Sequence, residues 1–151
     1  MYQHILVPLD GSATAQRGLR EALQLASEQK SRVRLLHVID DFPMLMEMSS
    51  VSNFEASMQK VREYGEDVLA SAKAAAAALD VQAETVVREV TQGRIADVVV
   101  DEARTNGCDL IVMGTHGRRG FRRMALGSDA DLVVRASPVP VLLVRGEPEP
   151  S

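Results

Sequence analysis

The chain has 151 residues, of which 46% are hydrophobic and 25% charged, so it is long enough for one globular domain with a sizeable core. Its formal net charge is −4 and only 3% of its residues are aromatic, which argues against a surface that tracks nucleic-acid phosphates or stacks bases. We therefore expect no nucleic-acid partner. A lone cysteine excludes an internal disulfide, and the place of Cys108 at the start of an apolar run favours a small buried side chain over a reactive thiol.

The N-terminus lacks the basic region and the long apolar region of a signal peptide. No apolar stretch approaches the ~20 residues that a membrane span needs. We therefore expect a cytoplasmic protein that does not enter a membrane.

The first half of the chain alternates between apolar runs and helical patterns. Residues 5–9 form a continuous apolar run, which is typical of a buried parallel strand. Ser12 is a good N-cap for the helix that follows it. Residues 33–39 predict a second strand, and residues 54–79 predict a helix that closes in a run of alanines. Residues 40–54 between them read as irregular.

The second half continues the same alternation. Residues 81–87 alternate, as a strand with one less buried face would. A helical pattern follows over 94–103, and Gly107 is the residue that terminates this helix. A fourth strand is predicted over 108–113. The last elements are a helix over 129–135, a strand over 139–144 and a polar tail, residues 147–151, that we expect to be disordered.

This order of elements predicts a parallel sheet covered by helices on both faces. In such sheets, ligands bind beyond the carboxyl ends of the strands, where the strand order reverses. Asp10, Gly11 and Ser12 follow the first strand, and Gly114 follows the fourth. If those strands are neighbours, both loops line one crevice. Pro140 cannot donate a ladder hydrogen bond, so an edge position suits the fifth strand.

The most informative segment runs from Gly114 to Ser128. Its glycines let the backbone turn tightly and approach a bulky anion with amide groups pointing inward. Gly127 and Ser128 open a helical pattern, and the start of a helix favours a phosphate. The loop also contains four arginines, at positions 118, 119, 122 and 123. The segment therefore predicts a phosphate site.

Other phosphate-binding and nucleic-acid-binding motifs fit less well. The chain has neither the Gly-Lys-Ser/Thr end of a Walker A loop nor the G-x-G-x-x-G fingerprint of dinucleotide folds. Gly117 and Gly120 enclose two arginines, as in the GXXG loop of a KH-type RNA binder, but that loop joins two helices and this one leaves a buried strand.

Several single residues have more than one possible role. Asp10 is a turn residue, a ribose ligand, or a catalytic or metal-binding carboxylate. His116 in the glycine loop is a phosphate contact or a base, and Arg118 is the arginine expected nearest a phosphate. His4 and His37 read as structural. No histidine, cysteine and carboxylate cluster has metal-ligand spacing, although a Mg²⁺ bridged by nucleotide phosphates needs none.

Four stretches of the chain together resemble the universal stress protein family. They are Ile-Leu-Val-Pro-Leu-Asp-Gly-Ser at 5–12, Leu-His-Val at 36–38, Asp-Leu-Ile-Val-Met-Gly-Thr-His-Gly-Arg at 109–118 and Pro-Val-Pro-Val-Leu-Leu-Val-Arg at 138–145. The resemblance implies one domain over residues 1–146. It also implies an α/β fold with a five-stranded parallel sheet in the order 3-2-1-4-5 and helices on both faces, of the adenine nucleotide α-hydrolase-like, Rossmann-like type.

Members with this glycine pattern bind nucleotide, so the resemblance also implies a site for ATP, or for AMP or ADP, with Mg²⁺ as an optional companion. Carried over by position, the adenosine would be lined by Pro8, Leu9 and Asp10, with Asp10 on the ribose. Adenine would lie against the backbone of Val38, and the ribose side would be closed by Met113 and Gly114. The phosphates would be held by His116, Gly117, Arg118, Gly127 and Ser128.

The resemblance points to a stress-response regulator that forms a homodimer by antiparallel pairing of its last strand, the run bounded by Val139 and Val144. Asp129 directly follows the phosphate residues, and its charge could let AMP or ADP compete with ATP, help hold a Mg²⁺ or lean away as a helix N-terminal anion. One alternative is a slow ATP hydrolase, although no residue stands out as the group that orients water. Another is a nucleotide-independent interaction module that uses the methionine-rich segment bounded by Met44 and Met58, for which core filling or loop coverage is the simpler reading.

Overall fold

A five-stranded parallel sheet forms the centre of the fold. The computed structural model describes residues 1–40, 51–90, 92–115 and 126–146. The strands are β1 (His4–Pro8), β2 (Arg32–Ile39), β3 (Ala83–Glu89), β4 (Leu110–Gly114) and β5 (Val141–Val144). They pair in the order β3-β2-β1-β4-β5, and every pair is parallel. The predicted fold class and strand order are therefore confirmed, and β5 lies at an edge as expected.

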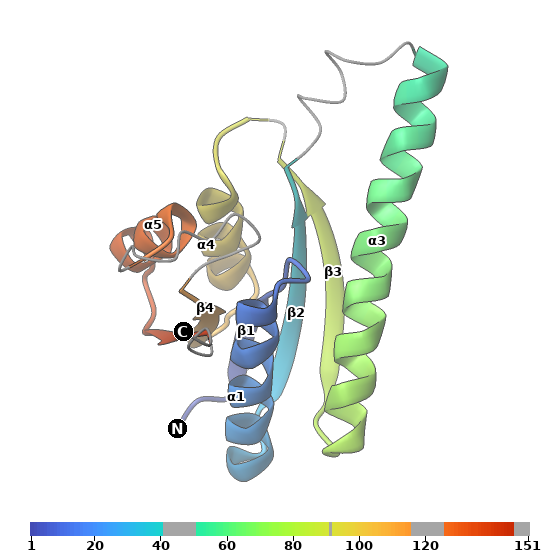
Figure 1. The fold of residues 1–151 in the computed structure, drawn as a ribbon. Coiled ribbons are helices and arrows are strands. Elements are labelled where there is room, and N and C mark those ends of the chain that lie inside the picture. Colours follow the sequence, from blue (N-terminus) through green and yellow to red (C-terminus); the bar gives the residue numbers. More distant parts are fainter. Residues whose placement is uncertain (41–50, 91, 116–125, 147–151) are drawn as a thin grey trace, which may run out of the picture.

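Helices cover both faces of this sheet (Figure 1). They are α1 (Ala13–Gln29), α3 (Val51–Ala78), α4 (Ile95–Thr105) and α5 (Ser128–Ala136). Helices α1 and α3 pack on one face, and α4 and α5 pack on the other. Among the described residues, no helix combines the length and the apolarity that crossing a bilayer requires.

The central position of β1 explains why its apolar run is continuous. Ile5, Leu6 and Val7 have no exposed surface. Ile5 and Val7 join the apolar cluster under α1 and α3, whereas Leu6 joins the cluster under α4 and α5. Since neighbouring residues of a strand point to opposite faces, a strand covered on both sides needs apolar residues at every position.

Three helices end in the same left-handed turn, and this turn moves two strand starts from their predicted places. In each turn one residue has a positive φ; these residues are Lys30, Asp80 and Gly107, at the ends of α1, α3 and α4 respectively. The next N–H groups, including those of Val81 and Cys108, bond to a carbonyl in the last turn of the helix, as in a Schellman motif. Val81 and Cys108 therefore complete helix ends, and β3 and β4 begin later than the predicted 81 and 108.

The methionine-rich stretch is only partly described. Met44, Met46 and Met48 lie outside the described residues, as do residues 147–151 of the expected tail. Met58, in α3, is 2% exposed. Core filling is therefore the role of this one methionine.

Candidate functional site

The carboxyl ends of β1, β2 and β4 meet at one edge of the sheet. β1 pairs with β2 on one side and with β4 on the other. The strand order reverses between β1 and β4, where ligands of parallel sheets bind. The condition set by the sequence is therefore met, because the loop after Pro8 and the loop after Gly114 leave from neighbouring strands.

The loop between β1 and α1 is ordered by the side chain of Asp10. Its Oδ1 atom accepts a hydrogen bond of 2.9 Å from the N–H of Ser12. The Oγ atom of Ser12 then accepts from the N–H of Ala15 at 3.1 Å, which is the N-cap bond expected for α1. Gly11 between them has a φ of +85°. Asp10 therefore performs the turn role that its position predicts, and the same bond fixes the direction of its carboxylate.

The backbone of this loop is also held from helix α3, a contact that sequence reasoning missed. The Tyr64 hydroxyl donates to the carbonyl of Asp10 at 3.2 Å. The buried His37 contacts the preceding carbonyl, that of Leu9, through Nδ1 at 2.8 Å. Because a carbonyl only accepts, Nδ1 carries the proton in this bond. His37 is thus structural, as expected, and it is structural for the candidate site.

Three of the predicted ligand contacts have side chains in the core. Leu9, Val38 and Met113 are 3%, 7% and 8% exposed respectively. Val38 and Met113 belong to the apolar cluster under α4 and α5. A ligand at this edge would therefore meet these residues through their backbone groups.

Gly114, at the end of β4, lies against the first turn of α1. A Cβ atom at Gly114 would be 2.6 Å from Cγ2 of Thr14 and 3.0 Å from its carbonyl carbon. One turn further along α1, a Cβ atom at Gly18 would be 3.4 Å from the backbone nitrogen of Gly114. The glycine at 114 is thus required by close helix–strand packing, whereas the sequence suggested a tight turn and backbone approach to an anion.

The two ends of the glycine-rich segment are joined. The N–H of Gly127 donates to the carbonyl of Thr115 at 2.7 Å, and the N–H of Thr115 donates to Val144 of β5 at 3.0 Å. Gly127 is the N-cap of α5, and Ser128 is its exposed first residue. The expected helix start at Gly127 and Ser128 is therefore confirmed.

The remaining phosphate residues, His116, Gly117 and Arg118, lie outside the described residues. The first turn of α5 carries two carboxylates, Asp129 and Asp131. Asp131 is paired with Arg135 at 3.1 Å. Carboxylates at a helix N-terminus interact favourably with its dipole, but they oppose a phosphate at the same place.

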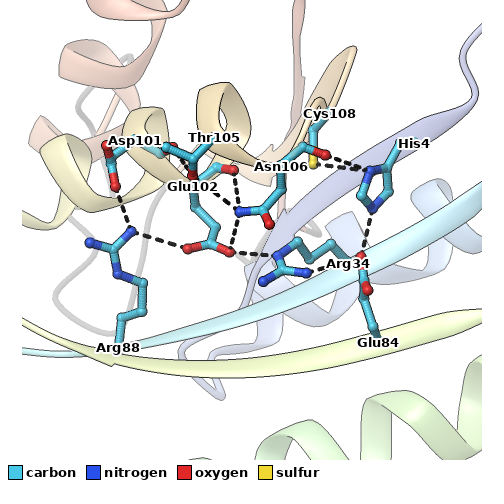
Figure 2. Close-up of polar contacts among 9 residues, drawn as sticks. All are labelled: His4, Arg34, Glu84, Arg88, Asp101, Glu102, Thr105, Asn106 and Cys108. Carbon is cyan, nitrogen blue, oxygen red and sulfur yellow. Dashed lines mark hydrogen bonds and ion pairs between the residues drawn. The ribbon is translucent and has the colours of Figure 1, made fainter.

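A second polar cluster lies on the face of the sheet under α4 (Figure 2). At its centre is Glu102, whose side chain is 5% exposed. Its Oε2 atom contacts Nε of Arg34 at 2.5 Å, and its Oε1 atom contacts Arg88 at 3.1 Å. The amide of Asn106 donates to Oε2 at 2.8 Å. The buried carboxylate is thus compensated by two guanidinium groups and an amide.

His4 extends this cluster toward the amino end of β1. Its Nε2 atom lies 2.8 Å from Oε1 of Glu84, which also receives Arg34 at 3.1 Å. Burial alone would raise the pKa of Glu84, but the hydrogen bonds from Arg34 and His4 outweigh it and hold this pKa below its usual value. His4 is 4% exposed, in agreement with the structural role predicted for it.

Cys108 lies beside this cluster as an inert thiol. It is 4% exposed, and burial raises the pKa of its thiol to about 11. A thiol that stays protonated is neither a nucleophile nor a metal ligand at neutral pH. The predicted burial of Cys108 is therefore confirmed, and its raised pKa agrees with the prediction of an unreactive thiol. Over the residues that the structure describes, no group of three or more His, Cys, Asp or Glu side chains could hold a metal ion.

The sequence is similar to a known family along nearly its whole length. The model of the universal stress protein family matches residues 1–145. Universal stress protein MJ0531 of Methanocaldococcus jannaschii is 31% identical over 145 residues, which cover 96% of this chain and 83% of that protein. Universal stress protein YxiE of Bacillus subtilis is 33% identical over 153 residues, which cover 96% of this chain and 100% of that protein.

Solved structures share the fold along nearly the whole chain. The structure of MJ0577 of Methanocaldococcus jannaschii has a TM-score of 0.84 at 26% identity and covers 99% of both chains. A universal stress protein in complex with cAMP has a TM-score of 0.66 at 24% identity, covering 95% of this chain and 97% of that one. The protein of Archaeoglobus fulgidus in complex with dAMP has a TM-score of 0.66 at 20% identity, covering 95% of this chain and 98% of that one.

Proposed function

Since this chain belongs to the universal stress protein family, we propose that it binds ATP or a related adenine nucleotide and acts as a stress-response regulator. Two solved neighbours are complexes with cAMP and dAMP, which supports an adenine nucleotide as the ligand class. The observation that carries the proposal is the meeting of the Asp10 loop and the joined ends of the glycine-rich segment at the edge where the strand order reverses.

The described residues fit such a ligand in chemical terms. A carboxylate beyond a strand end suits ribose hydroxyls, and Asp10 is held there by its bond to Ser12. Pro8 and the backbone groups of Leu9, Val38 and Met113 offer contacts for the adenosine, with Gly114 beside them. The start of α5 at Gly127 and Ser128 offers amide groups and the positive dipole end to phosphates.

In this proposal, His116, Gly117 and Arg118 complete the phosphate contacts from within the glycine-rich segment. Mg²⁺ would be bound through the phosphates rather than by a protein cage. Asp129 would make AMP or ADP competitive with ATP, because each added phosphate charge is repelled by the carboxylate. An Asp129→Asn variant should then gain affinity for ATP more than for AMP.

Isothermal titration with ATP, ADP and AMP tests the proposal. The parent should bind at least one of them with a dissociation constant below about 1 mM. Asp10→Ala should weaken binding by about tenfold or more, because it removes charge-assisted bonds to the ribose. Glu28→Ala is the matched control, since it removes an exposed carboxylate from the far end of α1. No binding of any of the three nucleotides by the parent would end the proposal.

Turnover is a separate measurement. We propose binding and regulation without efficient hydrolysis, so phosphate release from ATP should stay near background in the parent. A release rate that falls in both Asp10→Ala and His116→Ala would favour the slow hydrolase instead. We also propose the cytoplasm as the location, which cell fractionation checks.

We further propose a homodimer through β5. This strand is an edge of the sheet, and Leu142 at its middle is 38% exposed. An apolar edge strand invites pairing with a second copy, here antiparallel over the run bounded by Val139 and Val144. Leu142→Lys should shift the mass measured by light scattering to that of a monomer. Leu79→Lys is the control, since Leu79 is 48% exposed but follows α3, away from β5.

A further inference from the structure

Helix α3 contributes a residue to the candidate site that neither the glycine-rich segment nor the strand ends predict. We propose that Tyr64 is a positioning residue, whose hydroxyl holds the Asp10 loop so that the carboxylate of Asp10 meets the ribose hydroxyls. The inference rests on the proposed function. It adds a determinant of ribose recognition that comes from outside the two loops of the site.

The contact of Tyr64 with the loop is direct and close. Its hydroxyl donates to the carbonyl of Asp10 at 3.2 Å. A Cβ atom at Gly11 would lie 2.0 Å from the Tyr64 hydroxyl oxygen and 3.0 Å from Cζ. The end of the phenol ring therefore rests on the peptide that follows Asp10, and it occupies the space that any side chain at position 11 would need. The left-handed φ of +85° at Gly11 gives a second reason for glycine there.

The ring of Tyr64 is in turn held by its neighbours. It lies edge-on to the ring of His37, with the centroids 6.1 Å apart and the planes at 69°. His37 is 2% exposed and is bonded to the carbonyl of Leu9. At Gly65 a Cβ atom would be 2.5 Å from Cδ2 of His37, so the absence of a side chain there lets α3 lie directly on the histidine ring. Tyr64 is thus 43% exposed but lies with its ring against a buried and hydrogen-bonded histidine.

These contacts bear on the orientation of the Asp10 side chain. The carbonyl of Asp10 is held by Tyr64, and the carboxylate of Asp10 is held by the N–H of Ser12 at 2.9 Å. With a donor on each, the backbone and the side chain of Asp10 are both fixed before a ligand arrives. Without the hydroxyl, the carbonyl of Asp10 loses this hydrogen bond, and the peptide between Asp10 and Gly11 is less constrained. Recognition of ribose by Asp10 should then become less selective.

The test compares Tyr64→Phe with the parent for two ligands, ATP and 2′,3′-dideoxy-ATP. The variant keeps the ring and its contact with His37, and it removes only the hydroxyl. If Asp10 binds the ribose, the parent should prefer ATP by about tenfold or more. In Tyr64→Phe the preference should fall to about threefold or less. A purely structural contribution would weaken both ligands equally and leave the ratio unchanged.

Tyr2→Phe is the matched control, because Tyr2 is the other tyrosine of the chain. It precedes β1, at the end of the strand away from Asp10, where its N–H donates to the side chain of Gln29. A second readout needs no nucleotide. Exchange of the Ser12 amide hydrogen in the ligand-free protein should be about fivefold faster in Tyr64→Phe, since a weakened loop opens more often.

The outcomes separate the two proposals. If the parent binds no adenine nucleotide, the proposed function fails, and the exchange rate of Ser12 alone then decides whether Tyr64 positions the loop. If the parent binds ATP without preferring it to the dideoxy ligand, Asp10 does not read the ribose and the role of Tyr64 is refuted. An unchanged preference in Tyr64→Phe, or an unchanged Ser12 exchange rate, refutes it as well.

Discussion

Replacing Gly114 with alanine should destabilise the ligand-free protein. The new Cβ atom would be 2.6 Å from Cγ2 of Thr14, 3.0 Å from its carbonyl carbon and 3.1 Å from its carbonyl oxygen. The methyl group could move by rotation of the side chain, but the two backbone atoms belong to the first turn of α1 and cannot move alone. Overpacking of this kind costs about 1–3 kcal/mol, and contacts to backbone place the expected loss near the middle, about 2 kcal/mol.

Urea unfolding of the parent and Gly114→Ala without nucleotide measures this loss. A loss of about 2 kcal/mol corresponds to about 4–8 °C in melting temperature for a chain of this size. Thr14→Ser, which removes Cγ2, should recover part of the loss when combined with Gly114→Ala. Equal stability of the parent and Gly114→Ala would refute helix packing as the reason for this glycine and leave ligand approach as the reason.

Gly107→Ala is the control for this experiment. A Cβ atom there meets nothing within 4 Å, but the φ of +66° disfavours any side chain. Its cost, about 1 kcal/mol, is conformational and should not change when Thr14→Ser is added. The two glycines therefore separate crowding from backbone strain.

Three further predictions concern the polar cluster under α4 and its surroundings. Glu102→Gln should lower the free energy of unfolding by about 3 kcal/mol, because it leaves Arg34 under-compensated, and unchanged unfolding in urea would contradict this. Cys108, with its pKa raised to about 11, should react with a thiol reagent about 100-fold more slowly in the native protein at about pH 8 than in urea, and equal rates would contradict its protected state. Burial would raise the pKa of Asp109, but the N–H groups of Gln3 and His4 donate to its carboxylate and hold this pKa below its ordinary value of 3.8. The pKa of Glu84 is likewise held below 4.5, so the stabilisation from both groups is present above these values and is lost as the pH falls through the lower folded-state values. Asp109→Asn should therefore lower stability at about pH 7 and flatten its decline below about pH 4, as followed by circular dichroism; an equally steep decline would show that Asp109 does not contribute.

The order of strands and helices could be predicted from the sequence because burial imposes one apolar pattern on central strands and another on helices. The run Ile5–Leu6–Val7 had to be apolar throughout once its strand was covered on both faces. The stripe in α1, which includes Leu19 and Leu23, had to follow the helical repeat. Strand boundaries were less accurate, since local hydropathy does not reveal that the N–H of Val81 completes a helix end.

The candidate site could be predicted only where residues close in the sequence determine the local structure. Asp10 and Ser12 lie two residues apart, and their turn and cap could be read directly. Tyr64 and Asp10 are joined by helix α3 lying across the loop, and Gly114 and Thr14 by α1 lying across β4. Such contacts depend on how closely helices and strands that are distant in the sequence pack, and a local sequence pattern does not predict this. A glycine without an obvious turn, such as Gly65 in a helix, was the available hint.

The carbonyl groups at the carboxyl ends of the strands connect α3 to the proposed nucleotide site. The carbonyl oxygens of Leu9, Asp10 and Thr115 accept hydrogen bonds from His37, Tyr64 and the N–H of Gly127 respectively. An oxygen with exposed lone pairs repels a phosphate, so a site for phosphates is better built from donors when nearby acceptors are engaged elsewhere. Two of these three donors, His37 and Tyr64, have aromatic rings that lie edge-on to each other. In the proposed nucleotide site, the residues that bind these carbonyls would therefore contribute alongside the amide groups that meet the ligand.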